Sequence, residues 1–163
     1  MSAAREQTET ILAVGVADAA ALARLHAELF EPAWDTGSFK QILTHPGCAA
    51  LFARSSRTGK IVGFVIGRSA ADEMEILSLG VARERQRQGI GRRLLEALIG
   101  VASRSEVRRL YLEAAAGNSA AIALYSRLGF EQCGRRRGYY ARAGAPAEDA
   151  ILLSLVLSPD ARP

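Results

Sequence analysis

The sequence predicts a single domain of the α/β (α+β) class, built on a mixed sheet of seven strands with four helices. The chain has 163 residues, which suits one hydrophobic core, and its 49% hydrophobic and 23% charged residues are ordinary for a globular protein. Strand-like apolar runs come first as a meander and then alternate with helical patterns. We expect one domain over residues 1–163, with a core over about 10–157 and a frayed tail at 158–163.

The first part of the chain predicts one strand and two helices. Residues 11–14 are a short apolar run and predict a strand. Asp18 is placed as the N-cap of a helix that Pro32 ends. Asp35 begins a second, shorter helix, which Pro46 and the glycine after it close.

Three strands and the longest helix follow. Residues 49–53 and 61–67 predict a hairpin around the turn at 55–60, and residues 73–81 predict a third strand. The helix opens at Gly89. Its apolar stripe consists of Leu94, Leu95, Leu98, Ile99 and Ala102.

The last part of the chain predicts three strands and a helix. Residues 110–114 predict a strand, and a helix over 118–128 begins at Asn118 and has Gly129 as its C-terminal cap. Residues 130–136 and 150–157 predict the last two strands. The predicted order is therefore β-α-α-β-β-β-α-β-α-β-β.

Composition excludes several classes of function. No apolar run reaches the roughly 18–20 residues of a membrane span, and residues 1–10 lack the apolar stretch of a secretory signal, so we expect a cytoplasmic protein without a membrane role. Cys48 and Cys133 form no CxxC pair, and His26 and His45 have no metal-ligand spacing, so no metal is expected. The net charge of +4 favours anionic partners without choosing among them.

A basic, glycine-containing loop between a strand and a helix is the strongest local signal. The strand ends at Val81 and the helix opens at Gly89, with glycine again at position 91. The first N–H groups of a helix have no partner within it, and together with the helix dipole they favour an anion. Arg87 and Arg92 or Arg93 can add charged donors. The loop predicts a pyrophosphate site, or else a basic loop that merely precedes a surface helix. Walker A and dinucleotide-binding patterns do not match.

The segment Gln86-Arg87-Gln88-Gly89-Ile90-Gly91 resembles the Gln/Arg-x-x-Gly-x-Gly/Ala signature of GNAT-type acetyltransferases. The resemblance runs from about Thr10 to Leu157. It implies a mixed, mostly antiparallel seven-stranded sheet flanked by about four helices, and acetyl-coenzyme A as cosubstrate. The residues that it implies for coenzyme binding lie at the strand end, in the loop and at a later helix start: Leu79, Gly80, Val81, Gln86, Arg87, Gln88, Gly89, Ile90, Gly91, Arg92 and Asn118.

Acetyl transfer to an amine needs a proton acceptor and a proton donor. An α-amino group with a pKa near ~8 is mostly protonated at neutral pH, and the departing thiolate benefits from a donor. Glu113, in a predicted strand, and Tyr125, two helical turns after Asn118, have suitable side chains. Without the resemblance, the residues themselves favour a solvated strand residue at Glu113 and a packed core aromatic at Tyr125.

The stretch from Leu112 to Tyr125 is similar to the ribosomal-protein alanine N-acetyltransferase subgroup of this family. That similarity implies that Glu113 accepts the proton, that Tyr125 donates one, and that Asn118 contacts the coenzyme. Two further motifs resemble segments that border the subgroup's slot for the substrate N-terminus. They are Arg137-Gly138-Tyr139-Tyr140 and Glu148-Asp149-Ala150, which imply substrate contacts by Tyr139, Tyr140, Glu148 and Asp149.

We therefore expect acetylation of a protein N-terminus, most specifically the N-terminal alanine of a small-subunit ribosomal protein, by direct attack in a ternary complex. Ribosome association is possible under this reading, and DNA is not an expected partner. Two alternatives stay open: acetylation of lysine, polyamine or small-molecule amines by the same fold, and a non-catalytic RNA- or ribosome-binding module. Two features depart from the family pattern: Gly80 where alanine is common, which predicts a looser strand end, and an alanine- and glycine-rich loop at 141–147.

Overall fold

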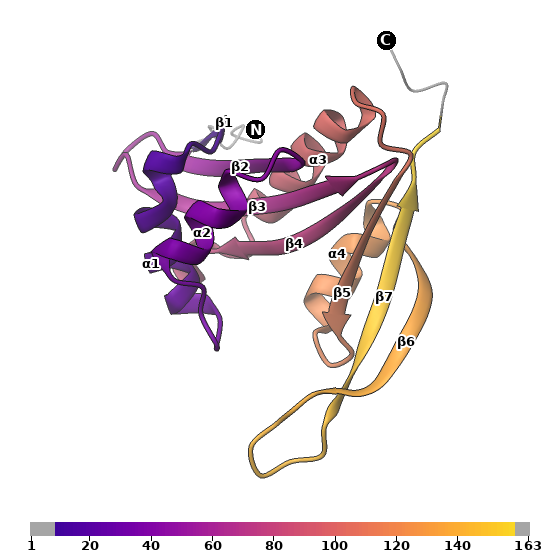
Figure 1. The fold of residues 1–163 in the computed structure, drawn as a ribbon. Helices are drawn as coiled ribbons and strands as arrows, with labels where there is room; N and C mark the ends of the chain where they lie inside the picture. Colours follow the sequence, from indigo (N-terminus) through magenta and orange to yellow (C-terminus); the bar gives the residue numbers. More distant parts are fainter. Residues whose placement is uncertain (1–8, 159–163) are drawn as a thin grey trace, which may run out of the picture. The chain divides into compact units, whose positions relative to one another are not determined.

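The computed structural model of the chain describes residues 9–158, and Figure 1 shows its helices and strands. Their order confirms the predicted one. The bounds are β1 Glu9–Ala13, α1 Ala19–Leu29, α2 Thr36–Leu43, β2 Cys48–Ser55, β3 Ile61–Ala70, β4 Glu73–Val81, α3 Ile90–Ser103, β5 Arg109–Ala115, α4 Ser119–Arg127, β6 Glu131–Tyr140 and β7 Glu148–Val156. Two 3-10 turns, η1 Val16–Asp18 and η2 Arg83–Arg85, were not predicted. Apart from Ser158, the predicted frayed tail lies outside the described residues.

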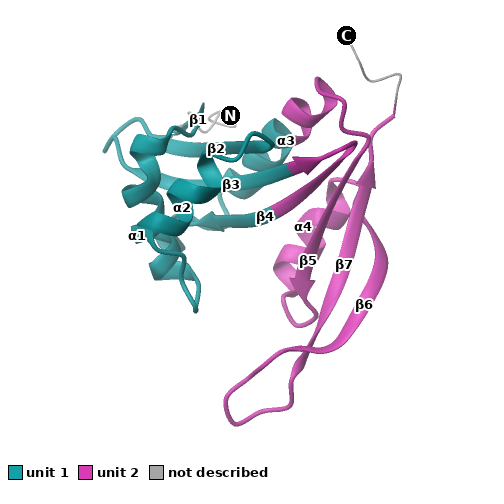
Figure 2. Cartoon of the chain, in the orientation of Figure 1, with its two compact units in different colours: residues 1–68, 77–98 teal, residues 69–76, 99–163 magenta. Residues whose placement is uncertain are grey.

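The strands form a mixed, mostly antiparallel sheet in the order β1-β2-β3-β4-β5-β7-β6. β4 pairs with β5 in parallel, whereas β1–β2, β2–β3, β5–β7 and β6–β7 are antiparallel. The expected fold class is therefore confirmed. The chain divides into two compact units, residues 1–68 with 77–98 and residues 69–76 with 99–163, which Figure 2 distinguishes by colour.

In the first unit, helices cover both faces of the sheet. Neighbouring side chains on a strand point to opposite faces. On β3, the ring of Phe64 lies 6.2 Å from that of Phe39 on α2, while a Cβ on Gly63 would meet Ile90 and Leu94 of α3. The centre of β3 is buried throughout because it is covered from both sides. The sequence of β3 is therefore a continuous apolar run and does not alternate between apolar and polar residues.

The second unit contains the antiparallel strands β5, β7 and β6 with helix α4. Asn118 caps α4, since its Oδ1 accepts a hydrogen bond from the N–H of Ala121 at 3.2 Å. Gly129 follows this helix with φ at +94°, a conformation that glycine adopts without strain. Both helix boundaries confirm the sequence-based prediction.

Of two predictions about element ends, one is confirmed and one needs correction. Asp18 holds the predicted N-cap position of α1, and its carboxylate accepts a hydrogen bond from Gly15 N–H at 2.8 Å and so closes the preceding 3-10 turn. Strand β6 continues to Tyr140, beyond its predicted end at Arg136. The sequence of this extension lacks the apolar alternation that predicts a strand, because β6 is an edge strand and largely exposed.

Gly80 is tightly packed, so the expectation that it loosens the end of β4 is wrong. A Cβ at this position would lie 2.9 Å from Leu29 Cδ1 and 2.9 Å from Phe64 Cε1, and Phe64 is fully buried. We expect Gly80→Ala to lower the free energy of unfolding by about 1–3 kcal/mol, because overpacking forces buried neighbours to shift. Urea denaturation measures this change.

A matched control uses Gly100 in α3. A Cβ there would meet only the flexible Arg104 guanidinium, at 3.5 Å. Gly100→Ala should stabilise the protein by about 0.5–1 kcal/mol, the ordinary gain of alanine over glycine within a helix. A Gly80→Ala variant as stable as the parent would show that Leu29 and Phe64 can move aside without lowering the free energy of unfolding.

Candidate functional site

The loop between β4 and α3, in the first unit, adopts a shape that its sequence does not favour locally. Arg87 has φ at 61° and Gly89 has φ at 82°. Glycine enters this left-handed region freely, but for arginine it costs about 1–2 kcal/mol. A Cβ on Gly89 would meet no atom within 4 Å, so that side of the loop is open.

A run of backbone N–H groups in this loop is left unpaired within the described residues. The first helical hydrogen bond of α3 runs from Arg93 N–H to Gly89 O at 3.1 Å. None of the N–H groups from Arg87 to Arg92 donates to another described residue. Unpaired N–H groups at the positive end of a 14-residue helix suit a phosphate or pyrophosphate. The residues present therefore fit the predicted anionic part of the coenzyme.

Both glutamines of the motif are used inside the loop. Gln86 donates from Nε2 to Val81 O at 3.0 Å. Gln88 donates from Nε2 to Glu84 O at 3.3 Å and accepts from Arg85 Nε at 3.3 Å. Their side chains hold the loop in shape, and the backbone N–H of Gln88 donates to no described residue.

The basic side chains around the loop differ in their availability. Arg87 is exposed and makes no ion pair with a described residue, so it can meet an anion directly. Arg92 pairs with Glu96 at 2.8 Å on the exposed face of α3. Arg93, considered as an alternative to Arg92, is instead held by Glu9 at 2.6 Å. Arg93 is therefore a structural residue in this arrangement.

The predicted proton acceptor lies in the second unit. Glu113 sits on β5 opposite Leu152 of β7, and its side chain is 25% exposed. Glu113 Oε1 lies 3.2 Å from Nε of Arg136 on β6. The Arg136 guanidinium also lies over the ring of Tyr139, 5.3 Å from its centroid. Sequence reasoning missed this role of Arg136, since three consecutive arginines carry no signal as to which of them meets Glu113.

The predicted proton donor is a mostly buried phenol. Tyr125 on α4 is 8% exposed and packs edge-on against Phe130, with ring centroids 5.7 Å apart. Burial raises the pKa of Tyr125 to about 12. Every fully buried side-chain polar atom in the described part of the chain has a hydrogen-bond partner, whereas the Tyr125 hydroxyl has none among residues 9–158. This hydroxyl therefore reaches the accessible surface, protonated at neutral pH.

Two tyrosines and two carboxylates gather at the end of β6. Tyr140 is half-buried, and its ring centroid lies 5.2 Å from that of the exposed Tyr139. Burial raises the pKa of Tyr140, and the nearby negative charges of Glu113 and Glu148 raise it further. Glu113 and Glu148 therefore share one environment with the phenol of Tyr140. Aromatic faces with carboxylates suit a cationic group such as an ammonium.

Glu148 and Asp149, at the start of β7, are both engaged within the second unit. Glu148 Oε1 accepts a short hydrogen bond from Gly117 N–H, and Oε2 lies 3.7 Å from Arg142. Asp149 accepts from Arg135 Nε at 2.6 Å and from Gly138 N–H at 2.8 Å, and these two contacts lower its pKa. Asp149 thereby fixes β6 against β7, and its contact with substrate stays a prediction.

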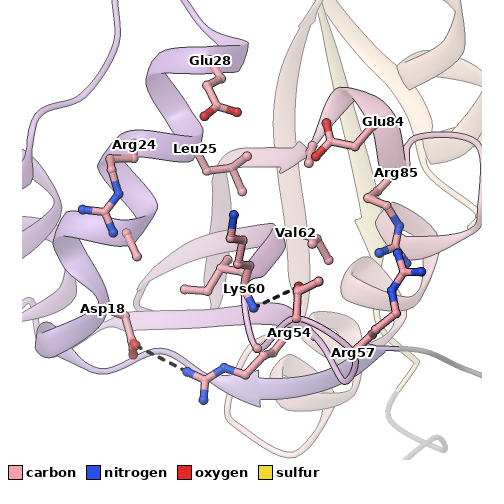
Figure 3. Close-up of a pocket in the computed structure, with 15 residues that line it drawn as sticks. Asp18, Arg24, Leu25, Glu28, Arg54, Arg57, Lys60, Val62, Glu84 and Arg85 are labelled. Atoms are coloured by element: carbon pink, nitrogen blue, oxygen red, sulfur yellow. Dashed lines mark hydrogen bonds and ion pairs between the residues drawn. The ribbon is translucent and has the colours of Figure 1, made fainter.

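A separate hollow of about 640 Å³ lies in the first unit between α1, the β2–β3 turn and η2 (Figure 3). Its walls carry both signs of charge, with Arg24, Arg57 and Lys60 facing Glu28 and Glu84. No residue predicted for the site lines it. Among residues 9–158, no cluster of His, Cys, Asp or Glu is arranged to hold a metal ion, and no helix is long and apolar enough to cross a membrane.

Comparison with known proteins gives concordant results. A family model described as the acetyltransferase (GNAT) family matches residues 19–130. The [ribosomal protein bS18]-alanine N-acetyltransferase of Escherichia coli (strain K12) is 39% identical over 74% of this chain and 81% of its own length. The N-alpha-acetyltransferase RimI of Mycobacterium tuberculosis is 40% identical over 85% of this chain and 88% of its own. The crystal structure of the ribosomal-protein-S18-alanine N-acetyltransferase from E. coli superimposes with a TM-score of 0.84 at 33% identity, covering 92% of this chain and 94% of that one.

Proposed function

We propose, given that the chain belongs to the acetyltransferase (GNAT) family, that it moves acetyl from acetyl-coenzyme A to the α-amino group of a protein N-terminus. The acceptor that we propose is the N-terminal alanine of a small-subunit ribosomal protein. The support is that relatives 39% identical over three quarters of this chain are named as alanine N-acetyltransferases of ribosomal protein bS18. The proposal includes a cytoplasmic location and contact with the ribosome or its free protein.

The observation that carries the choice of acceptor is the group formed by Glu113, Tyr140 and Glu148. Tyr140 on β6 lies opposite Glu148 on β7, and the charges of Glu148 and Glu113 both act on its phenol, so an aromatic ring and two carboxylates belong to this group. A peptide α-ammonium is a single compact cation and suits this group. Arg136 pairs with Glu113 and Arg142 with Glu148, so a multiply charged polyamine would find no excess of negative charge among these residues.

The proposed reaction moves protons both to and from side chains of this chain. Acetyl-coenzyme A supplies the acetyl group as an activated thioester. Glu113 takes a proton from the substrate ammonium, directly or through water, and so produces the neutral amine that attacks. Tyr125 gives its phenolic proton to the sulfur as the C–S bond breaks, and the second proton that the attacking nitrogen loses returns to the phenolate, directly or through water. The Tyr125 pKa of about 12 keeps the phenolic proton in place until the transfer.

We propose coenzyme contacts in each of the two units. In the first unit, N–H groups from Arg87 to Arg92 and the Arg87 guanidinium bind the pyrophosphate, and the end of β4 at Leu79, Gly80 and Val81 offers backbone groups to the pantetheine arm. In the second unit, Asn118 keeps its side-chain NH₂ for the coenzyme, since only its Oδ1 is used as a cap. The family model spans parts of both units, which supports one functional domain.

Direct attack in a ternary complex is the proposed route, without an acetyl-enzyme intermediate. Cys48 is a poor nucleophile because burial raises the pKa of its thiol. Cys133 is exposed and lies at an irregularity in the pairing of β6 with β7. A labelled acetyl group retained on the protein after incubation without acceptor would contradict this route.

The decisive experiment offers acetyl-coenzyme A together with peptides that differ only at residue one and carry an internal lysine. We expect acetyl on the N-terminal nitrogen, with alanine preferred, because the proposed slot accepts one compact ammonium beside Glu113. Fragmentation mass spectrometry locates the acetyl group. Acetylation confined to lysine would overturn the N-terminal assignment while leaving the acetyltransferase intact. Salt-dependent RNA binding with no turnover would instead favour the non-catalytic alternative.

A further inference from the structure

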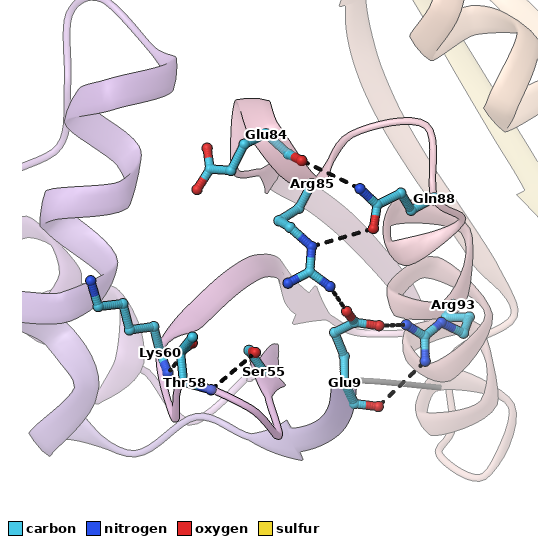
Figure 4. A network of polar contacts seen from close by, with 8 residues as sticks. All are labelled: Glu9, Ser55, Thr58, Lys60, Glu84, Arg85, Gln88 and Arg93. Carbon is cyan, nitrogen blue, oxygen red and sulfur yellow. Dashed lines mark hydrogen bonds and ion pairs between the residues drawn. The ribbon is translucent and has the colours of Figure 1, made fainter. Parts of the chain in front are cut away.

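We infer that Glu9 is a positioning residue for the coenzyme loop and acts through Arg85 and Arg93. The inference rests on the proposed coenzyme site, and Glu9 itself belongs to β1, outside the signature motif. Its carboxylate bridges two arginines that lie on either side of the loop, one in η2 and one in the first turn of α3 (Figure 4). One side chain thus ties together the two ends of the phosphate-binding segment.

The contacts of Glu9 are close and shielded from water. Its side chain is 6% exposed, and those of Arg85 and Arg93 are 17% and 23% exposed. Oε1 pairs with Arg85, and Oε2 accepts from Arg93 Nη2 at 2.6 Å. Arg93 Nη1 also donates to the backbone oxygen of Glu9 at 3.4 Å. Charge-assisted, forked contacts of this kind fix direction as well as distance.

The effect of Glu9 continues into the loop through Arg85. The Nε of Arg85 donates to Gln88 Oε1, and Gln88 Nε2 in turn donates to Glu84 O. Gln88 lies between Arg87 and Gly89, the two positions with positive φ. The carboxylate of Glu9 therefore supports the backbone conformation that leaves the N–H groups unpaired. Without it, the two guanidinium groups lose the carboxylate that they share.

Two interpretations of Glu9 predict opposite changes in coenzyme affinity. If only net charge near the loop matters, Glu9→Gln adds positive charge and should tighten binding of a polyanion. If Glu9 positions the loop, the same change should weaken binding because the donors lose their alignment. Once bound, the acetyl thioester meets unchanged groups at Glu113 and Tyr125, so turnover at saturating coenzyme should stay within about twofold of the parent value.

The test measures the Kd of acetyl-coenzyme A by titration calorimetry and KM and kcat by steady-state kinetics on the full chain. We expect Glu9→Gln to raise Kd and KM about tenfold or more, with kcat nearly unchanged. Glu96→Gln is the matched control, because it removes an equal charge from the exposed pair with Arg92 on the same helix. This control should leave Kd unchanged or slightly lower.

A second variant distinguishes weaker coenzyme binding from a loss of folding. Glu9→Asp keeps the charge, but it is one methylene shorter and spans the two arginines less well, so its Kd should fall between the parent and Glu9→Gln. Unchanged or tighter binding in both variants, or a loss of kcat at unchanged affinity, would overturn the inference. Gly89→Val tests the proposed coenzyme site itself, because valine is strained at the φ of 82° that Gly89 adopts. If Gly89→Val leaves the Kd unchanged, the proposed coenzyme site fails independently of Glu9.

Discussion

Replacement of Glu113 by glutamine is expected to lower kcat for peptide acetylation by a factor of about 10²–10⁴ at pH 7, the range for loss of a general base. Glutamine has nearly the same shape but cannot accept a proton from the substrate ammonium. The Kd of acetyl-coenzyme A should not change, because the proposed pyrophosphate contacts come from the β4–α3 loop. Release of free thiol from the coenzyme measures turnover, and calorimetry measures the affinity.

The same variant breaks the contact between Glu113 and Arg136, so its effect on folding must be separated from its effect on chemistry. Arg136 is 53% exposed, and partly exposed ion pairs contribute only about 0–1 kcal/mol. Glu73→Gln provides the control, since Glu73 on β4 also faces an arginine, Arg109, at 4.0 Å. Glu73→Gln should keep full turnover. If Glu113→Gln did so as well, Glu113 would have no catalytic role.

Replacement of Tyr125 by phenylalanine should lower kcat by about 10² or more, since the thiolate would then leave without a positioned proton donor. The ring should keep its edge-on contact with Phe130, and the lost hydroxyl bonds to no described residue, so the thermal midpoint should scarcely move. Single-turnover kinetics with saturating acetyl-coenzyme A isolates the chemical step. A variant with parental rates would assign the proton donor elsewhere.

The pH dependence gives an independent check on Tyr125. Burial disfavours the charged phenolate and therefore raises the pKa of Tyr125, from about 10 for an ordinary phenol to about 12. The donor form thus persists to higher pH, and kcat should show no decline between pH 9 and roughly 10.5 from ionisation of this phenol. A decline centred near pH 10 in the parent that Tyr125→Phe abolishes would show that the phenol is not shielded in this way.

Much of the fold was predictable because its signals are local. Asn118 and Gly129 bound α4 as predicted, since capping chemistry depends on a few neighbouring residues. The end of β6 was not predictable in this way. Its pairing with β7 depends on Asp149, whose carboxylate reaches back to Gly138 and Arg135, and such a contact leaves no periodic pattern in the sequence.

The candidate site likewise combines residues that the local sequence predicts with residues that it does not. The glycines and arginines of the β4–α3 loop are adjacent in sequence and predict an anion site by themselves. Glu9 gave no such signal, because its partners Arg85 and Arg93 lie 76 and 84 residues away. Arg136 was equally hidden, as its contact with Glu113 depends on how β5, β7 and β6 align. Contacts of this kind appear only once the strands are paired.

The contact between Gly117 and Glu148 constrains how this protein can change over evolutionary time. A Cβ at position 117 would collide with Glu148 Oε1, although Gly117 itself lies on the surface and does not have a positive φ. Because that oxygen ends a flexible side chain, a larger residue at 117 would push the Glu148 carboxylate aside and break its hydrogen bond with the backbone N–H at this position. Across descendants, the two positions should consequently vary as a linked pair.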